Sequence, residues 1–217
     1  MTQGVSAKAA RRTQGERSAA TRRALLEATI DVLIEDGYAQ LTNAKVTTRA
    51  QLSRGAQVHH FPTKALLVSE AIQYLIGQVG EALFTEIGTL PNGPERTNAG
   101  LDLLWNTFRG RTFQAVLELS VAVRDPEIKG KLTVLNQVTT DIIRGAAPVL
   151  FPDRANETAF QDTLFTVVST MSGLALSQRV AGLSEGEAAE RWKRTKTDLL
   201  RLFDPASSTP SNSSPSR

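Results

Sequence analysis

The stretch 47–64, TTRAQLSRGAQVHHFPTK, holds the side chains best suited to binding chemistry. Arg54 and Gln57 carry donors that can bind the edges of guanine and adenine in the major groove of DNA. Ser53 is placed to cap a short helix, and Pro62 ends it because the residue before a proline avoids helical angles. The pattern predicts a helix, a tight turn and a short second helix, which is helix-turn-helix geometry.

Neighbouring residues in this stretch could hold the DNA backbone. Thr47 and Thr48 lie on the preceding predicted helix, 44–50, where their hydroxyl groups could bond phosphate oxygens. Gly55, a small residue near the start of the second helix, would let that helix enter the groove. Base contacts would supply specificity, while phosphate contacts would supply salt-dependent affinity.

The same residues offer little to a catalytic or metal-binding interpretation. His59 and His60 are the two histidines of the chain, and adjacent side chains on a helix diverge by about 100°. They cannot form a metal pair or a charge-relay arrangement, and the chain has no Cys. Nucleophile-elbow, P-loop and dinucleotide-binding motifs are also missing from the sequence. We therefore expect no enzyme activity, no cofactor and no metal site.

Charge is distributed unevenly along the chain. Residues 1–64 hold ten Lys and Arg against five acidic residues, whereas the remaining residues hold fifteen against seventeen. A basic end of this kind is the electrostatic footprint of a nucleic-acid contact, although a solvated surface is the alternative interpretation. Residues 1–17 are predicted to be a disordered basic arm, which could reach a minor groove or be an ordinary mobile terminus.

The remaining pattern is helical throughout the 217 residues, and 41% hydrophobic content supports a substantial core. Gly37 is a predicted helix stop, and Ser184 with Glu187 forms a predicted capping box. A low-complexity tail, 204–217, is expected to be disordered. With no membrane span or signal segment, we expect a cytoplasmic protein. The expected helices span 18–36, 44–50, 54–60, 63–89, 95–108, 111–123, a segment that begins at Pro126 and is ended by Pro148 and Phe151-Pro152-Asp153, 156–182 and 184–203.

Residues 18–71 resemble the DNA-binding domain of the TetR (tetracycline-repressor) family of bacterial transcription regulators. The resemblance rests on the motifs Ala50-Gln51, Leu52-Ser53-Arg54-Gly55-Ala56 and His60-Phe61-Pro62-Thr63-Lys64. It implies an all-α fold, with an N-terminal three-helix helix-turn-helix domain over 18–73. A C-terminal helical domain over 74–203 would dimerise and bind a ligand.

The resemblance also implies roles for single residues. His59 matches a position that often reaches bases, while His60 and Lys64 match positions that contact phosphate. Ser53 and Gly55 belong to the family's Ser-x-Gly motif, and we include them among the expected DNA-binding residues.

Two departures from the family pattern have structural consequences. Gln51 stands where the family has a turn glycine, so it must adopt a left-handed or distorted turn at a cost of roughly 1–2 kcal/mol. Gln57 and Val58 replace a Leu-Tyr pair. The contact that this tyrosine usually makes with the DNA backbone is therefore absent. Gln57 either turns outward toward bases or bonds within the domain.

The second domain could host a small apolar ligand between its helices. The alternative for any one of the expected lining residues is that it only packs in the core of the domain. The two helices near 156–182 and 184–203 are the expected homodimer face, forming a four-helix bundle with their symmetry mates. The expected lining residues are Trp105, Phe108, Phe113, Leu117, Phe165 and Met171.

From these features and the resemblance we expect a dimeric, sequence-specific transcription regulator. It would bind double-stranded DNA at a roughly palindromic operator. The expected mode is a repressor released by its ligand. A DNA-binding dimer, repressor or activator, without small-molecule control is the alternative. A helical binding module or enzyme that has lost its DNA role is a third possibility, which the departures at Gln51, Gln57 and Val58 leave open.

Overall fold

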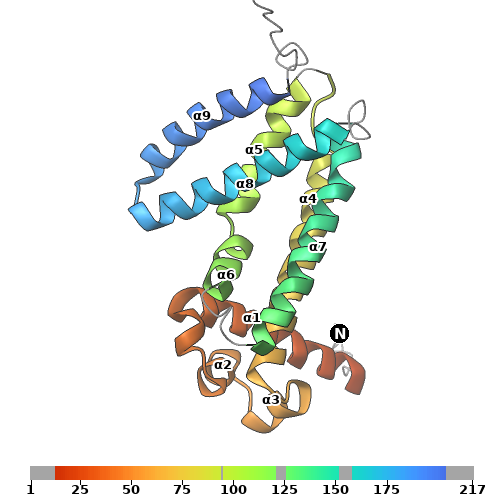
Figure 1. Ribbon diagram of the computed structural model, residues 1–217. Helices are drawn as coiled ribbons and strands as arrows, with labels where there is room; N and C mark the ends of the chain where they lie inside the picture. Colours follow the sequence, from red (N-terminus) through yellow and green to blue (C-terminus); the bar gives the residue numbers. More distant parts are fainter. Residues whose placement is uncertain (1–12, 94, 121–125, 152–157, 204–217) are drawn as a thin grey trace, which may run out of the picture. The chain divides into compact units, whose positions relative to one another are not determined.

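The computed structural model describes residues 13–93, 95–120, 126–151 and 158–203, and every regular element in these ranges is an α-helix (Figure 1). The predicted all-α fold is therefore confirmed. No helix among the described residues has a long enough apolar stretch to cross a membrane. The helices are α1 Gln14–Gln40, α2 Asn43–Ala50, α3 Arg54–His60, α4 Lys64–Ile87, α5 Glu95–Arg109, α6 Arg111–Ser120, α7 Pro126–Leu150, α8 Thr158–Ala181 and α9 Glu185–Leu202.

The chain divides into two compact units. Unit 1 contains the described residues within Met1–Tyr74 and Glu118–Leu132, and unit 2 contains those within Leu75–Leu117 and Thr133–Arg217. Helix α4 contributes its first turns to unit 1 and the remainder to unit 2.

Helix α1 begins earlier than the sequence pattern indicated. Thr13 caps it through a capping box, in which Thr13 Oγ1 accepts from the amide of Glu16 and the Glu16 carboxylate accepts from the amide of Thr13. Residues 14–17 are therefore helical, which corrects the predicted boundary of the arm. Gly37 breaks the helical geometry with a φ of 77°, as expected of a stop glycine. Residues 1–12 and 204–217 lie outside the described residues.

Unit 1 is held together by a compact apolar core on which α1, α2 and α3 pack. Ion-pair and hydrogen-bond contacts then tie α1 to the first turns of α4. Arg22 pairs with Glu70, and Tyr74 Oη donates to the Glu27 carboxylate at 3.0 Å. The largest side chains in this core with less than 2% exposure are Leu25, Leu26, Leu33, Leu41, Phe61, Leu67 and Ile72.

Unit 2 has a separate core in which residues distant in the sequence meet. The indole rings of Trp105 and Trp192 stack with centroids 4.7 Å apart and planes 12° from parallel. Trp192 Nε1 donates to Asp102 at 2.8 Å, and Lys196 binds the other carboxylate oxygen of Asp102 at 2.8 Å. These contacts join α5 to α9, and Figure 1 shows α5, α8 and α9 side by side.

Two predicted helix ends in unit 2 meet different outcomes. Ser184 and Glu187 form the expected capping box at the start of α9. This bonding to Ser184 lowers the pKa of the Glu187 carboxyl group. Pro148 does not end α7, which continues to Leu150 and stops directly before the other predicted breaker, Phe151-Pro152-Asp153. Proline removes one backbone amide, and in the last turn of a helix that loss affects a single hydrogen bond.

The turn between α2 and α3 depends on one strained residue. Gln51 adopts a φ of 55° and a ψ of 40°, and is the non-glycine residue with positive φ among the described residues. The amide of Leu52 donates to Thr47 O at 3.0 Å, which closes the end of α2. The expectation of a left-handed Gln51 is confirmed.

We predict that Gln51→Gly stabilises unit 1 by about 1 kcal/mol, because glycine has no Cβ to clash in the left-handed region. The measurement is the free energy of unfolding from denaturant titration. Gln40→Gly is the matched control, since Gln40 is an exposed helix residue without positive φ. It should leave stability unchanged or lower it, and equal effects of the two substitutions would contradict the strain argument.

Candidate nucleic-acid interface

Helix α3 is a two-turn helix fixed at both ends. Ser53 Oγ accepts from the amide of Ala56 at 3.2 Å, which caps the start of the helix. At the other end the amide of Phe61 donates to Gln57 O at 2.7 Å, and Pro62 prevents continuation. The Phe61 side chain is buried in the core of unit 1. The predicted short second helix of the helix-turn-helix is thus present.

One face of α3 is open to solvent. Successive residues of an α-helix are about 100° apart, so four of the seven residues fall on a continuous arc of about 140°. This outward arc holds Arg54, Gly55, Val58 and His59, all exposed. Ser53, just before the helix, is also exposed. The predicted residues Ser53, Arg54, Gly55 and His59 therefore lie on one accessible surface.

Gln57 does not belong to that surface. Its side chain is 0% exposed, and its Nε2 donates to the backbone oxygen of Phe61 at 2.7 Å. Of the two alternatives, the structure shows Gln57 bonding within the domain, so its assignment as a base-contacting residue is corrected. The physical reason is its place on the inward arc, where the family pattern has a buried leucine. Its Oε1 atom is buried without a hydrogen-bond partner.

Val58 is an outward residue that sequence reasoning missed. In the sequence, Val58 indicates only the loss of a tyrosine contact with the DNA backbone. Its position four residues after Arg54, on the same side of a helix, was the signal that could have identified it. Its side chain is 45% exposed.

The predicted phosphate-binding threonines differ in accessibility. Thr48 is exposed on α2. Thr47 is buried, and its hydroxyl donates back to Asn43 O at 3.0 Å and Ala44 O at 3.1 Å. The structure therefore gives Thr47 a role inside α2 and leaves Thr48 as the accessible hydroxyl group.

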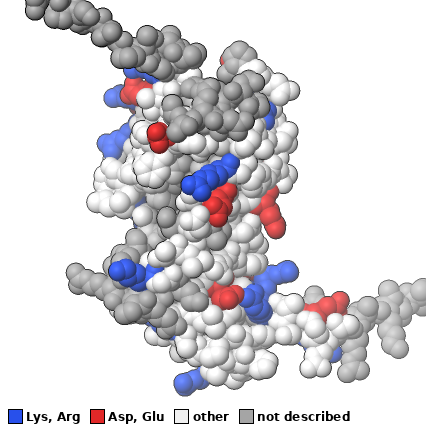
Figure 2. Space-filling model, turned by 45° about the vertical axis from the view of Figure 1, so that its right-hand side comes forward, with Lys and Arg blue, Asp and Glu red and all other residues white. Residues whose placement is uncertain are grey.

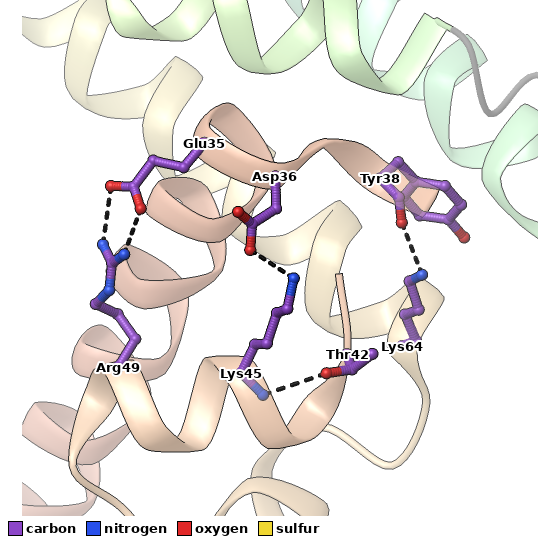
Figure 3. A network of polar contacts seen from close by, with 7 residues as sticks. All are labelled: Glu35, Asp36, Tyr38, Thr42, Lys45, Arg49 and Lys64. Atoms are coloured by element: carbon purple, nitrogen blue, oxygen red, sulfur yellow. Dashed lines mark hydrogen bonds and ion pairs between the residues drawn. The ribbon is translucent and has the colours of Figure 1, made fainter. Parts of the chain in front are cut away.

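Basic residues of α2 and α4 face acidic and carbonyl oxygens of α1 (Figure 3). Arg49 binds both carboxylate oxygens of Glu35, one of them at 3.0 Å, and lies 3.4 Å from Asp31. The hydrogen bonds to Glu35 raise the pKa of the Arg49 guanidinium above its ordinary value. Lys45 pairs with Asp36 at 2.8 Å. In the face drawn in Figure 2, several cations likewise lie directly beside carboxylates.

Lys64 begins α4 and holds the end of α1. Its Nζ donates to the backbone oxygen of Tyr38 at 2.9 Å and lies 4.1 Å from the centroid of the Tyr38 ring. The predicted phosphate-contacting ammonium group thus has a structural bond within unit 1.

His60 is half-buried beside His59 and Phe61. Burial, together with the nearby His59 and Arg22, lowers the pKa of His60 below its ordinary value. The lowered pKa favours the neutral ring, which could meet a phosphate as a hydrogen-bond donor.

A hollow of about 210 Å³ lies in unit 2 between α5, α6, α8 and α9. Three of the expected ligand-binding residues, Phe108, Phe113 and Leu117, line it. The rings of Phe108 and Phe113 meet edge to face at 5.4 Å. The rest of the lining mixes apolar and polar side chains, namely Arg109, Gln114, Ala175, Gln178, Arg179, Leu183, Glu185 and Ala188.

The other expected ligand-binding residues do not line this hollow. Trp105 and Met171 are buried in the core of unit 2, where Trp105 stacks on Trp192. Phe165 is 74% exposed on α8. Helical spacing alone could not separate core, hollow and surface on these wide apolar helices. Among the described residues, no group of three or more His, Cys, Asp and Glu is arranged to hold a metal ion.

Comparison with solved structures agrees with the fold. A transcriptional regulator from Rhodococcus sp. superposes with a TM-score of 0.64 at 18% identity, covering 83% of this chain and 96% of its own. GusR of Salmonella enterica gives 0.60 at 18% identity, covering 87% and 98%. The multidrug binding protein EbrR, solved with imidazole, gives 0.59 at 17% identity, covering 89% and 98%.

Sequence comparisons give the family. The model of the bacterial regulatory proteins of the tetR family matches residues 25–71, which contain α2 and α3. An uncharacterized HTH-type transcriptional regulator of Mycobacterium bovis is 29% identical over 191 residues, 87% of this chain and 97% of its own. The HTH-type transcriptional regulator CymR of Pseudomonas putida is 32% identical over 196 residues, 88% of this chain and 94% of CymR. This chain therefore belongs to the TetR family of bacterial regulators, and it is a DNA-binding transcription regulator, not an enzyme.

Proposed function

We propose that the chain is a homodimeric repressor that binds a roughly palindromic operator and is released by a small ligand. The observation that carries the proposal is the outward face of α3, which presents Arg54, Gly55 and His59 together. A guanidinium group can bind guanine through two hydrogen bonds, and a residue without a side chain lets the helix approach the bases closely. As a DNA-bound bacterial regulator, it would act in the cytoplasm.

The proposed division of labour follows the two halves of the chain. Residues 18–73 bind the operator, and residues 74–203 dimerise and bind the ligand. The boundary between the two compact units after Tyr74 supports this division, while Glu118–Leu132 belongs to the first unit. A ligand would shift the dimer between two states, and it would weaken DNA binding only by its differential affinity for them.

Selection of bound sequences from random duplex DNA tests the operator proposal. A palindrome with half-sites about 34–36 Å apart is the expected result, because the two recognition helices of a dimer enter successive major grooves. Recovery of no preferred sequence, with binding that disappears as salt rises, would show that the basic surface binds DNA only nonspecifically.

Arg54→Ala should weaken operator binding by about 1–3 kcal/mol and relax the preference at one base pair of each half-site. Electrophoretic or fluorescence titration of operator variants measures both effects. Arg23→Ala is the control, since Arg23 is another exposed arginine of unit 1 with no ion-pair partner among the described residues. If both variants lose affinity equally for operator and random DNA, Arg54 does not contact a base.

The ion pairs of α2 lead to a second expectation. Arg49 can bind a phosphate only in competition with Glu35 and Asp31. Glu35→Gln removes one competing charge, so DNA affinity at low salt should rise. The slope of log affinity against log salt concentration should steepen by up to about 0.9 for each basic side chain released to bind a phosphate. The pair is exposed, so the stability change should stay below about 1 kcal/mol.

Glu86→Gln is the matched control for that experiment, because it removes the same charge from an exposed position of unit 2. It should leave the salt dependence unchanged. Weaker DNA binding by Glu35→Gln would instead mean that the Glu35–Arg49 pair positions α2 for DNA.

The proposed dimer face is an exposed apolar stripe on α8. Phe165 is 74% exposed, Leu176 is 44% exposed and Val180 is 78% exposed. Their spacing of eleven and fifteen residues places all three within about 60° on the helix. Exposed apolar surface of this kind marks an interface, and we propose that α8 and α9 pair with their symmetry mates.

Val180→Glu should dissociate the dimer, because association would bury an unpaired carboxylate. Sedimentation velocity should show a monomer, and the operator affinity should fall with the loss of the second half-site. Val134→Glu, at a half-exposed position of α7, is the control and should remain dimeric. A dimer of unchanged affinity for Val180→Glu would place the interface elsewhere.

The hollow lined by Phe108, Phe113 and Leu117 is the proposed ligand site, which suits a small ligand with an apolar body and a polar group. The multidrug binding protein EbrR, which shares the fold, supports ligand control by analogy. One observation favours a regulator without ligand control. The hollow measures about 210 Å³, which is less than the roughly 300–1,000 Å³ of ordinary ligand sites.

A thermal-shift screen separates these possibilities, since a ligand that binds the folded state raises the melting temperature. Leu117→Trp should fill the hollow, abolish the shift produced by any ligand found, and leave operator binding intact. Val134→Trp should leave both responses unchanged. A ligand that still shifts Leu117→Trp would bind at another site.

A further inference from the structure

Val58 is the one large apolar side chain that unit 1 exposes among the described residues. The other exposed large apolar residues, Phe84, Val134, Val149, Phe165, Leu176, Val180 and Leu202, all belong to unit 2. Unit 1 therefore keeps its other large apolar side chains at least partly covered, and leaves Val58 open to solvent on its recognition helix.

The neighbours of Val58 indicate what covers it. Val58 lies about 40° around α3 from Arg54 and within the same outward arc as Gly55 and His59. A guanidinium group and an imidazole flanking a valine suit a polyanion better than the apolar surface of another protein. The occupant must combine negative charge with a small apolar group.

Gly55 allows that occupant to come close. A Cβ added at Gly55 would meet only Ser53 Oγ, at 3.8 Å, which is ordinary van der Waals contact. Gly55 has no positive φ, so neither packing nor backbone conformation within the domain requires glycine there. The missing side chain therefore exposes the backbone of α3 beside Val58, where a groove floor can reach the valine methyl groups.

Duplex DNA has one apolar group at the edges of its bases in the major groove, the 5-methyl group of thymine. We propose that Val58 contacts a thymine methyl group and so selects an A·T pair in the operator. This inference rests on the proposed function of α3 as the recognition helix. Val58 lies one turn, about 6 Å, beyond Arg54 along the helix axis. Base pairs rise by about 3.4 Å, so the thymine should lie within about two base pairs of the position that Arg54 selects.

The test uses the selected operator and the same duplex with uracil in place of each thymine in that range. Uracil pairs as thymine does but lacks the methyl group. For the wild-type protein, one such replacement should weaken binding on the order of threefold to fivefold, which is the effect of exposing one methyl group. Val58→Ala should lose a similar factor on the thymine duplex and show no further loss on the uracil duplex.

Val134→Ala is the control, because it shortens an exposed valine of unit 2 and should keep the full thymine-to-uracil ratio. Circular dichroism melting checks that Val58→Ala remains folded. An unchanged ratio in Val58→Ala, with operator specificity retained, would overturn the inference while leaving the proposed function intact. Equal loss on operator and random DNA would assign Val58 to the DNA backbone and overturn it as well. Failure to select any sequence would overturn the proposed function and the inference with it.

Discussion

Helix α3 has only two turns, and a helix of that length is unstable by itself in water. Its outward face therefore exists because its inward face and both ends are held. Ser53 caps the start, and the buried ring of Phe61 anchors the end in the core of unit 1. The strained turn at Gln51 sets the direction in which α3 leaves α2. The exposed face of α3 is therefore a product of these local constraints.

Electrostatics in the DNA-binding unit serve two purposes at once. Lys45, Arg49 and Lys64 could each approach a phosphate, yet each binds an oxygen of α1 in the free protein. The excess of basic residues in 1–64 therefore overstates the charge that is free to bind DNA. Exposed ion pairs contribute little to stability, and in the proposed complex they would compete with phosphate for the same cations.

Sequence patterns predicted what depends on local chemistry. The helices and the Ser184 capping box follow from neighbouring residues, the left-handed Gln51 follows from the resemblance to a family with a turn glycine there, and the structure agrees. Side-chain surroundings set by distant residues could not be predicted. The sequence makes Trp105 a candidate ligand contact, whereas in the structure it stacks on Trp192, which lies 87 positions away in the chain. The inward turn of Gln57 was one of two alternatives that the sequence left open, because a glutamine suits both a base and a buried bond.

Gln57 shows why a buried polar residue can persist in a core position. A buried oxygen without a partner, such as its Oε1, costs about 1–3 kcal/mol, and an apolar residue would avoid that cost. Its Nε2, however, donates to the backbone oxygen of Phe61, the residue that follows α3. Because Pro62 ends the helix, no helical amide is left to donate to that oxygen. Gln57 thus ties the last turn of α3 to its own terminus. The energy lost at one oxygen is partly offset by this fixed helix end, which lies two residues beyond His59.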